Sequence, residues 1–382
     1  MNKKYIYFTA LLFLLLSSCD NGKKKLTNSQ KNISSFDVKN IEWRQKKDFS
    51  IKDIVRQVEY IKLEDNENSM FTSIDKMIIK DDRIYILDIT GSHKLLVFDK
   101  SGAFLHKVGS QGGGPGEYSR SMLNFCVGEH TDEVILFDYA KKTMLFYDSD
   151  GNFIKSEKTN FSFNDFMKIK DNNYLVSLDI FEESNNYNKV VVTRDLKENN
   201  KSYFKFDKDY KNDKLNVRSF QSNNDLISYM TPVSDTLYVF NNDGGIINGY
   251  YFDFKDRKLS KDLKNSYEEV VKSRRMGIHY TYIYETPIII KNYIVASMFM
   301  GGQKCISVFN TNNSELTHEI LNPETFDINN IYFPLCTIGD SILVSYIDSN
   351  IYGGIEDKLS ISTELDNHLK LGGAILCLYS IK

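Results

Sequence analysis

The chain contains few of the residue types that form local reactive or metal-binding sites. Its 382 residues include 5 cysteines, 5 prolines, 6 histidines and 1 tryptophan. No cysteine belongs to a C-x-x-C pair, and cysteines and histidines nowhere show the spacing of metal ligands. The sequence therefore predicts neither a metal site nor a cofactor. We expect Cys126, Cys305, Cys336 and Cys377, which lie in apolar segments, to be buried free thiols.

The chain also lacks a charge imbalance and a long apolar run. It has 48 Lys and Arg against 51 Asp and Glu, a net charge of −3, and the two signs are interspersed. A nucleic-acid partner, which requires a concentrated basic face, is therefore excluded. The sequence has no Gly-x-Ser-x-Gly or His-Glu-x-x-His motif. It thus favours a non-catalytic role without deciding against an enzyme.

The N-terminus has the features of an export signal. Lys3 and Lys4 precede an apolar run from Tyr5 to Leu16, which is shorter than the ~20 residues of a membrane-spanning helix. The run ends in Leu-Ser-Ser-Cys at 16–19, which resembles the lipobox of bacterial lipoproteins. The resemblance implies a signal peptide over 1–18 and a lipid anchor on Cys19; a plain secreted protein is the alternative. The Lys-, Asn- and Ser-rich residues of 19–50 are expected to form a flexible tether.

A polar turn followed by an apolar strand recurs six times along the rest of the chain. The apolar strands begin at residues 84, 134, 174, 237, 293 and 342, so the period is about 52 residues. With 24 Tyr and 25 Phe, the composition favours strands. Repeats of ~40–50 residues built from short strands are typical of β-propellers, with one repeat per blade. The sequence therefore predicts an all-β fold, a six-bladed β-propeller over 51–382.

Each blade is expected to contain four antiparallel strands. The first lies before the polar turn, and the third and fourth follow the central strand. The sixth repeat reaches only its third strand, Ala374–Ile381, before the last residue. The segment Val58–Leu63 alternates apolar and polar residues ahead of the first repeat. We predict that this N-terminal strand completes the last blade and closes the ring, which removes two exposed sheet edges.

The first two repeats resemble a known family. A strand ending in Leu-Asp, a strand ending in Phe-Asp and a later Gly-Gly-Gly-Pro-Gly-Glu-Tyr are similar to the pattern of six-bladed β-propeller lipoproteins of Bacteroidetes, relatives of the NHL-repeat propellers. The resemblance implies the propeller fold and a lipid-anchored position in the cell envelope, on the outer membrane or cell surface. Propellers of the NHL type mostly act as binding platforms, with a minority of lyases and lactonases.

The glycine-rich run has a structural and a ligand-binding interpretation. It consists of Gly112, Gly113, Gly114, Pro115, Gly116, Glu117 and Tyr118. A phosphate-binding loop requires a following Lys-Ser/Thr and a helix, and here a strand is expected to follow. We therefore predict a connection between the first two blades, in which the glycines adopt unusual φ values and Tyr118 packs between blades.

Candidate binding residues lie where the repeat is broken. In a propeller, the connections between blades share one face with the loops between second and third strands. The segment 274–282 and an insertion at 350–371 are expected on that face, and a second insertion, at 261–276, has helical composition. The ligand-binding candidates on that face are Arg120, Arg274, Arg275, His279, Tyr280 and Tyr282. Arginine and tyrosine are enriched at recognition sites, whereas the alternative is that Arg274 and Arg275 are solvated charges at a helix C-terminus.

Two functions of different classes remain. The favoured one is a monomeric, lipid-anchored, non-catalytic binding or scaffold module for an envelope protein, peptide or glycan, which includes an adaptor in an outer-membrane complex. The alternative is a propeller lyase or lactonase with a divalent metal bound in the channel.

Overall fold

The structure, a computed structural model, describes residues 36–42, 51–128, 133–179, 188–211, 216–320, 331, 333–355 and 361–382. All of these residues belong to one compact unit, Ser35–Lys382. The expected signal peptide, Cys19 and most of the expected tether lie outside the described residues.

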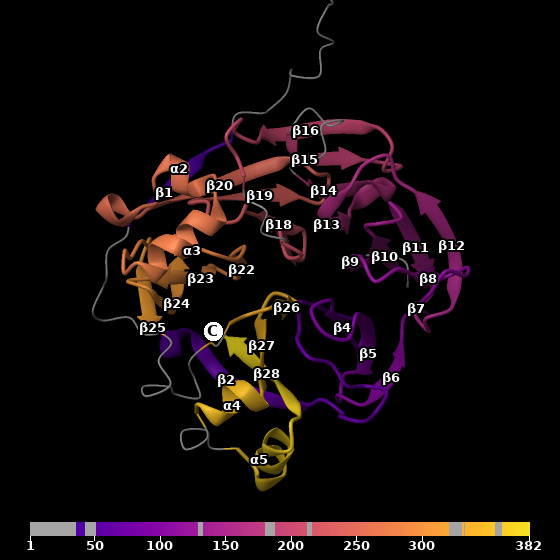
Figure 1. Cartoon of the computed structure of the whole chain (residues 1–382). Helices are drawn as coiled ribbons and strands as arrows, with labels where there is room; N and C mark the ends of the chain where they lie inside the picture. The colour runs from indigo at the N-terminus through magenta and orange to yellow at the C-terminus, as the bar shows by residue number, and fades with distance from the viewer. Residues whose placement is uncertain are drawn as a thin grey trace, which may run out of the picture. The chain divides into compact units, whose positions relative to one another are not determined.

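Six small antiparallel sheets stand around a central axis, so the prediction of a six-bladed propeller is confirmed (Figure 1). Blade 1 contains β3 (Lys76–Lys80), β4 (Arg83–Asp88), β5 (Lys94–Asp99) and β6 (Phe104–Lys107). Blade 2 contains β9 (Met122–Val127), β10 (Val134–Asp138), β11 (Thr143–Tyr147) and β12 (Phe153–Lys158). Blade 3 contains β13 (Phe163–Lys168), β14 (Tyr174–Leu178), β15 (Asn188–Thr193) and β16 (Asn199–Lys205).

Each of blades 4 to 6 contains at least one strand of 8 residues, together with short inner strands. Blade 4 contains β17 (Phe220–Asn223), β18 (Leu226–Tyr229), β19 (Thr236–Asn241) and β20 (Ile246–Asp253). Blade 5 contains the two short inner strands β21 (Tyr282–Ile283) and β22 (Ile288–Ile290), then β23 (Tyr293–Met300), β24 (Gln303–Asn310) and β25 (Leu316–Ile320). Blade 6 contains β26 (Cys336–Ile338), β27 (Ile342–Asp348) and β28 (Ala374–Ile381).

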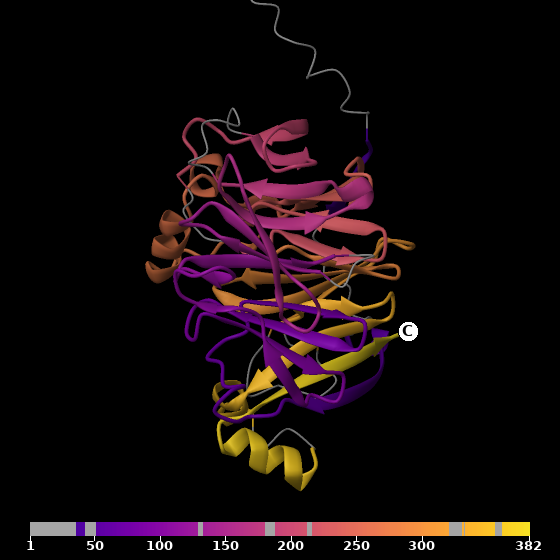
Figure 2. The ribbon, with the colours of Figure 1, turned by 90° about the vertical axis from the view of Figure 1, so that its right-hand side faces the viewer.

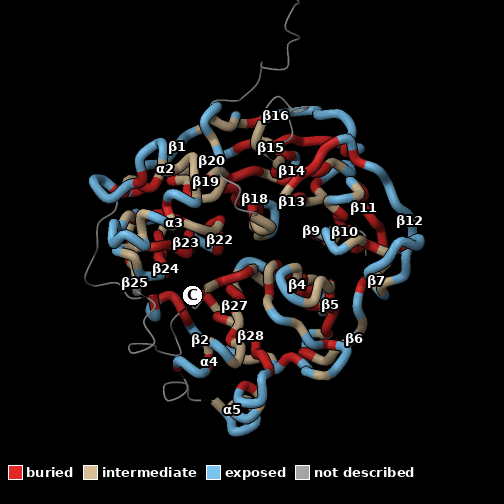
Figure 3. The backbone as a smooth tube through the Cα atoms, in the orientation of Figure 1, coloured by how far each residue is buried: buried red, intermediate tan, exposed pale blue. Residues whose placement is uncertain are grey.

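The second and third strands of a blade are buried on both faces, because each blade is covered by a neighbour on either side. Every residue of β10 and β11 is buried, whereas every residue of the outermost strand β12 is exposed (Figure 3). A hydrophobic cluster fills each of the six interfaces between blades; between blades 1 and 2, for example, Tyr85 and Val97 pack with Phe125 and Leu136. This double burial explains why the central strands are continuous apolar runs and show no alternation.

The N-terminal strand closes the ring as predicted. The short helix η1 (Ile51–Ile54) leads into β2 (Val55–Lys62), which pairs antiparallel with β28 as the fourth strand of blade 6. Tyr60 lies opposite Cys377, and the backbone N–H of Leu63 donates to the carbonyl of Ala374 at 3.1 Å. Blade 6 is thus built from both ends of the propeller unit.

The strands predicted for blade 4 are shifted by one position relative to the structure. The segment beginning at Leu237 was expected to be its second strand, and Leu226–Met230 its first. In the structure β18 is the second strand, β19 the third, and the innermost strand is β17. The equivalent polar turn is therefore Asn224-Asp225, and Asn224 has a positive φ of 50°. The error arose because Leu226–Tyr229 is interrupted by Ser228, whereas Leu237–Phe240 is a stronger apolar run.

A strand occurs within the range expected to form the tether. β1 (Val38–Glu42) pairs in parallel with β20, and adds a fifth strand to the outer edge of blade 4. Ile41 is 1% exposed and joins the cluster between blades 4 and 5. The propeller unit therefore begins before residue 51, where its boundary was expected.

Both insertions contain helices. The 261–276 insertion forms α2 (Lys261–Lys264) and α3 (Tyr267–Arg275), whose N-caps are Ser260 and Ser266. The 350–371 insertion contains α4 (Ser349–Gly353) and α5 (Thr363–Lys370). Short 3₁₀ turns occur at η2 (Lys170–Asn172) and η4 (Lys255–Arg257). α3 lies on the face opposite the C-terminus (Figure 2).

The glycine-rich loop connects blade 1 to blade 2. Its ends form the short parallel pair β7 (Ser110–Gln111) and β8 (Glu117–Tyr118), and Glu117 Oε2 accepts the N–H of Gly114 at 2.7 Å. Tyr118 is 1% exposed within the cluster between these blades, and burial raises its pKa to about 12. Its hydroxyl donates to the carbonyl of His93 at 3.2 Å. All these contacts hold the chain at the connection between blades.

Two glycines of this loop provide a matched test of its structural role. Gly116 has a φ of +73°, and a Cβ there would lie 2.6 Å from Phe153 Cγ, whereas a Cβ on Gly113 would meet nothing within 4 Å. We expect Gly116→Ala to lower the free energy of unfolding by about 1–2 kcal/mol, because the left-handed conformation is costly for alanine. Gly113→Ala is expected to stay within about 0.5 kcal/mol of the parent. Urea denaturation measures both, and equal losses would contradict the prediction.

Candidate functional site

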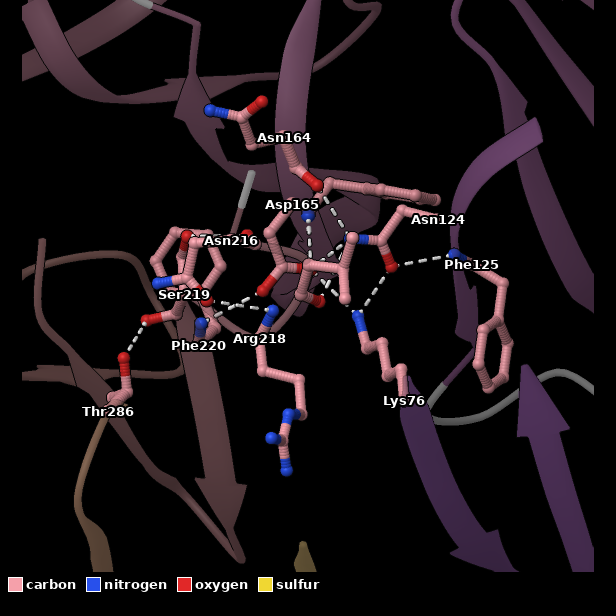
Figure 4. Close-up of polar contacts among 12 residues, drawn as sticks. Lys76, Asn124, Phe125, Asn164, Asp165, Asn216, Arg218, Ser219, Phe220 and Thr286 are labelled. Atoms are coloured by element: carbon pink, nitrogen blue, oxygen red, sulfur yellow. Dashed lines mark hydrogen bonds and ion pairs between the residues drawn. The ribbon is translucent and has the colours of Figure 1, made fainter. Parts of the chain in front are cut away.

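Three polar side chains meet at the centre of the ring, one from the innermost strand of each of blades 1 to 3 (Figure 4). Lys76 is the first residue of β3, Asn124 lies in β9 and Asp165 in β13. Lys76 Nζ lies 2.7 Å from Asp165 Oδ1 and 2.8 Å from Asn124 Oδ1. Lys76 is 6% exposed, and the other two are fully buried. We call these three residues the axial network.

Asp165 is fully hydrogen-bonded. Besides the ammonium of Lys76, its carboxylate accepts from Asn124 Nδ2 at 3.0 Å and from the backbone N–H groups of Phe166 and Phe220, both at 2.9 Å. Burial raises the pKa of Asp165, and the charge of Lys76 and its hydrogen bond act in the opposite direction. Since Phe220 belongs to β17, this single carboxylate connects the innermost strands of four blades.

Asn124 extends the axial network to the connection between blades 3 and 4. The two hydrogens of its Nδ2 are shared between Asp165 and the carbonyls of Asn164 at 2.7 Å and Val217 at 3.0 Å, and its Oδ1 accepts the N–H of Phe125 at 2.7 Å. The amide is therefore held in one orientation by backbone groups of three segments. Such a network specifies the relative position of the blades.

A cavity of about 200 Å³ adjoins the axial network. Its wall includes residues 76–80 of β3 and parts of β9, β13, β17 and β26, so five blades contribute. The lining continues to Lys80 and Asn224, next to the turns between first and second strands. In this topology those turns lie on the face opposite α3, so the cavity approaches that face.

The charged side chains of the cavity wall are all cations. Lys76, Lys80, Lys168 and Arg218 line it, and the lining residues include no Asp or Glu. Their acidic partners lie outside the lining. Lys168 Nζ, for example, is 2.9 Å from Glu133 Oε2. The charged residues that line the cavity are therefore exclusively basic.

Arg218 is the least satisfied of these cations. It precedes β17, and its Nη2 donates to Glu285 Oε1, which lies between β21 and β22 of blade 5. Its Nη1 is inaccessible to solvent and has no hydrogen-bond partner among the described residues. A buried guanidinium N–H without a partner is unfavourable, and an incoming oxygen acceptor would satisfy it.

Two thiols also line the cavity. Burial raises the pKa of both Cys126 and Cys336 to about 12. The thiol form therefore predominates at neutral pH, and thiolate chemistry is disfavoured. The expectation of free cysteines is confirmed for Cys126, Cys305, Cys336 and Cys377; Cys336 is only half-buried.

Four of the six candidate binding residues come together beside α3. The Arg274 guanidinium lies 4.5 Å from the ring centre of Phe299, and Tyr282 stacks on the same ring at 5.2 Å. His279 packs against Gly302, and Tyr280 is half-buried nearby. These side chains enclose no space that a water molecule could enter. Burial raises the pKa of Tyr282 to about 12.

The other two candidates lie apart. Arg275 is exposed at the end of α3. Arg120 lies in the connection between blades 1 and 2, where its Nε is 3.5 Å from His93 Nε2. The binding role of all six residues stays a prediction. The structure brings four of them together around Phe299 and separates Arg120 from them.

Sequence reasoning missed the axial network and the cavity. A signal was present, because Lys76, Asn124 and Asp165 each interrupt an apolar innermost strand near its start. An alignment of the first strands of blades 1 to 3 would have placed a polar residue at a similar position in each. Arg218 had no such signal, since it precedes β17, which was not predicted to be a strand.

The described residues contain neither a metal-binding cluster nor a membrane-spanning helix. No group of three or more His, Cys, Asp or Glu there is placed to hold a metal ion. No helix in those segments is long and apolar enough to span a bilayer.

Comparisons with known proteins agree with the fold. The sequence profile of a domain of unknown function, DUF4934, matches residues 33–371. A Bacteroides fragilis protein described as exported superimposes with a TM-score of 0.72 and 18% identity, covering 90% of this chain and 99% of that chain. A DUF4221 member from Bacteroides vulgatus gives 0.51 and 13%, covering 86% and 97%. No curated protein matches the sequence.

Proposed function

The chain belongs to the DUF4934 family, and we propose that it is a non-catalytic binding module that receives part of its ligand in the central cavity. The observation that carries this proposal is the cavity of about 200 Å³, whose wall is assembled from five blades. Such a site forms only in the complete ring, and the axial network fixes the blades around it. Preorganised concave sites with an apolar wall and a few polar groups are typical of ligand binding.

The chemistry around the cavity favours binding over reaction. The carboxylate of Asp165 is held by four donors, and the thiols of Cys126 and Cys336 have raised pKa values. The carboxylate and the two thiols are thus held in states that disfavour a role as base or nucleophile. The ligand in this proposal is an envelope protein, peptide or glycan that inserts one group.

A position in the cell envelope is part of the proposal. It is supported by the lipobox-like sequence that ends at Cys19 and by the similar Bacteroides fragilis protein that is described as exported. In this proposal the chain is anchored by lipid on Cys19 and works as a monomer. Kinship with NHL-repeat lipoproteins remains a resemblance of the first two blades.

Filling the cavity should abolish binding. Gln221 lies in β17 and lines the cavity, so we expect Gln221→Trp to occupy the space and to weaken binding to arrayed envelope peptides and glycans at least tenfold. Gln57→Trp introduces the same exchange at an exposed position of β2 and is expected to bind like the parent. Surface plasmon resonance against the ligands found on the array measures the difference.

A third variant separates the cavity from the residues beside α3. Arg275→Gln combined with His279→Gln removes two exposed candidates of the predicted site. If this double variant lost binding while Gln221→Trp kept it, the ligand would bind at the helix and the proposed site would be wrong. If no arrayed ligand bound the parent protein, the proposed function itself would be contradicted.

A further inference from the structure

The cavity wall selects for the charge of its occupant. Three lysines and one arginine line the wall, and their carboxylate partners Asp165, Asp81, Glu133 and Glu285 are not among the lining residues. Within the lining itself, a ligand therefore meets cationic residues and no carboxylate. An anionic group gains from this arrangement, and a cationic group would be repelled at short range.

The cations differ in how much hydrogen-bonding capacity they have left. Lys76 Nζ donates to both Asp165 and Asn124, so it is already committed to the axial network. Lys168 Nζ is bound to Glu133, but an ammonium has three donors. Arg218 offers the clearest vacancy, because Nη1 is buried and has no partner among the described residues. Arg218 is therefore the expected contact for an incoming oxygen, once its guanidinium turns this solvent-inaccessible nitrogen toward the cavity.

Apolar side chains form another part of the wall and limit the size of the ligand. Phe166, Phe220, Ile227, Met77 and Leu335 provide carbon surface around the charged groups. The volume of about 200 Å³ compares with cavities of about 150 Å³ that bind benzene. The space thus matches a group the size of one ring with a short substituent. A large polyanion does not fit.

Resting on the proposed binding function, we propose that the group inserted into the cavity is a carboxylate on a compact apolar body, and that the Arg218 guanidinium binds its oxygens. Guanidinium and carboxylate form charge-assisted hydrogen bonds that neutral amides do not match. Gln221, Ser222 and Asn224 line the cavity toward the polar turns, where the ligand continues toward solvent. Arg218 then determines the charge preference of the site, and the apolar wall determines its size preference.

The test uses 3-phenylpropionate and benzoate as probes, with 3-phenylpropanamide and benzamide as neutral partners of the same shape. Isothermal titration calorimetry on the mature protein should show carboxylates binding at least tenfold more tightly than the matched amides. Arg218→Gln should weaken carboxylate binding at least tenfold and leave amide binding unchanged. Arg257→Gln, an exposed arginine in η4, is the matched control and should behave like the parent.

Arg218→Lys controls for misfolding of the Arg218→Gln variant, because lysine keeps the positive charge and lacks the planar guanidinium. We expect it to bind carboxylates with intermediate affinity and to unfold at the same urea concentration as the parent. Equal affinity for acids and amides, or an unchanged carboxylate affinity in both Arg218 variants, would overturn the inference. If no probe bound while Gln221→Trp still abolished binding to arrayed ligands, the carboxylate class would be wrong and the binding function would stand. If Gln221→Trp had no effect either, the proposed site would fail.

Discussion

Replacing Lys76 with methionine is expected to lower the free energy of unfolding by about 3–5 kcal/mol, the cost of leaving a buried carboxylate without its partner. Asp165 is fully buried and cannot recover water as a substitute for the ammonium. The methionine fills similar volume, so the loss reports on charge more than on packing. Urea denaturation followed by far-UV circular dichroism measures the effect.

The control for this prediction is an exposed ion pair. Lys100 and Asp82 lie 3.0 Å apart, and their side chains are 71% and 73% exposed. Lys100→Met is expected to change stability by less than about 1 kcal/mol, because solvent screens such pairs. The double variant Lys76→Met with Asp165→Asn should recover part of the loss, since no unpaired charge remains. A Lys76→Met protein as stable as the parent would contradict a structural role for the axial network.

The pH dependence of the Lys76→Met variant gives an independent signature. Burial already raises the pKa of Asp165 in the parent, and removal of the ammonium takes away an influence that lowers it. A carboxyl whose pKa is higher in the folded than in the unfolded state is stabilising when protonated and loses that contribution as the pH rises. The deficit of the variant should therefore shrink when the pH falls from about 7 to about 5. A deficit that grew on acidification would contradict this explanation.

The propeller could be predicted because its central strands carry the same burial in every blade. Ile84–Leu87 and Val134–Phe137 are apolar throughout, since both faces are covered by neighbouring blades. β2 could be assigned from its alternation, in which half-buried Val58 and Tyr60 are separated by the exposed Glu59. The strands of blade 4 were predicted wrongly, because Ser228 interrupts the apolar run of its second strand. β1 could not be foreseen, because its burial pattern contains a single buried residue, Ile41.

The site was less predictable because its partners are remote in the sequence. Lys76 meets Asn124 and Asp165 across separations of 48 and 89 residues. A lone lysine at the start of an apolar strand does not indicate which acid will neutralise it. The candidates beside α3 were visible because they are adjacent along the chain, yet they pack around Phe299 and leave no cavity. The local density of polar and aromatic residues in the sequence thus identified a packed cluster. The cavity could not be found in this way, because its wall forms only when the ring is closed.

Removal of β2 is expected to cost the chain its cooperative fold. β2 forms seven residue pairs with β28, and Leu63 directly after it is 1% exposed in the cluster between blades 6 and 1. A chain that begins at Glu64 would leave blade 6 with an open edge and its core uncovered. Such edges promote association between chains. The expected loss of unfolding free energy exceeds the loss caused by removing a single buried side chain. It is comparable with the total stability of about 5–15 kcal/mol of a typical domain.

Three chains with different N-termini distinguish closure of the ring by β2 from the other contributions of the N-terminal segment to stability. A chain from Phe36 retains β1 and β2, and should match the parent chain in urea denaturation and size-exclusion chromatography with light scattering. A chain from Ile51 loses β1 and the burial of Ile41, so it should remain a folded monomer of lower stability. The chain from Glu64 should form oligomers without a cooperative transition, and a synthetic peptide of residues 51–64 should restore the monomer.

If the chain from Glu64 were a monomer that unfolds at the parent's urea midpoint, the ring would not depend on its N-terminal strand. If the peptide restored the monomer, the contacts of β2 would not require a covalent link to blade 1. A separate chain supplies the same hydrogen bonds to β28 and the same buried Leu63.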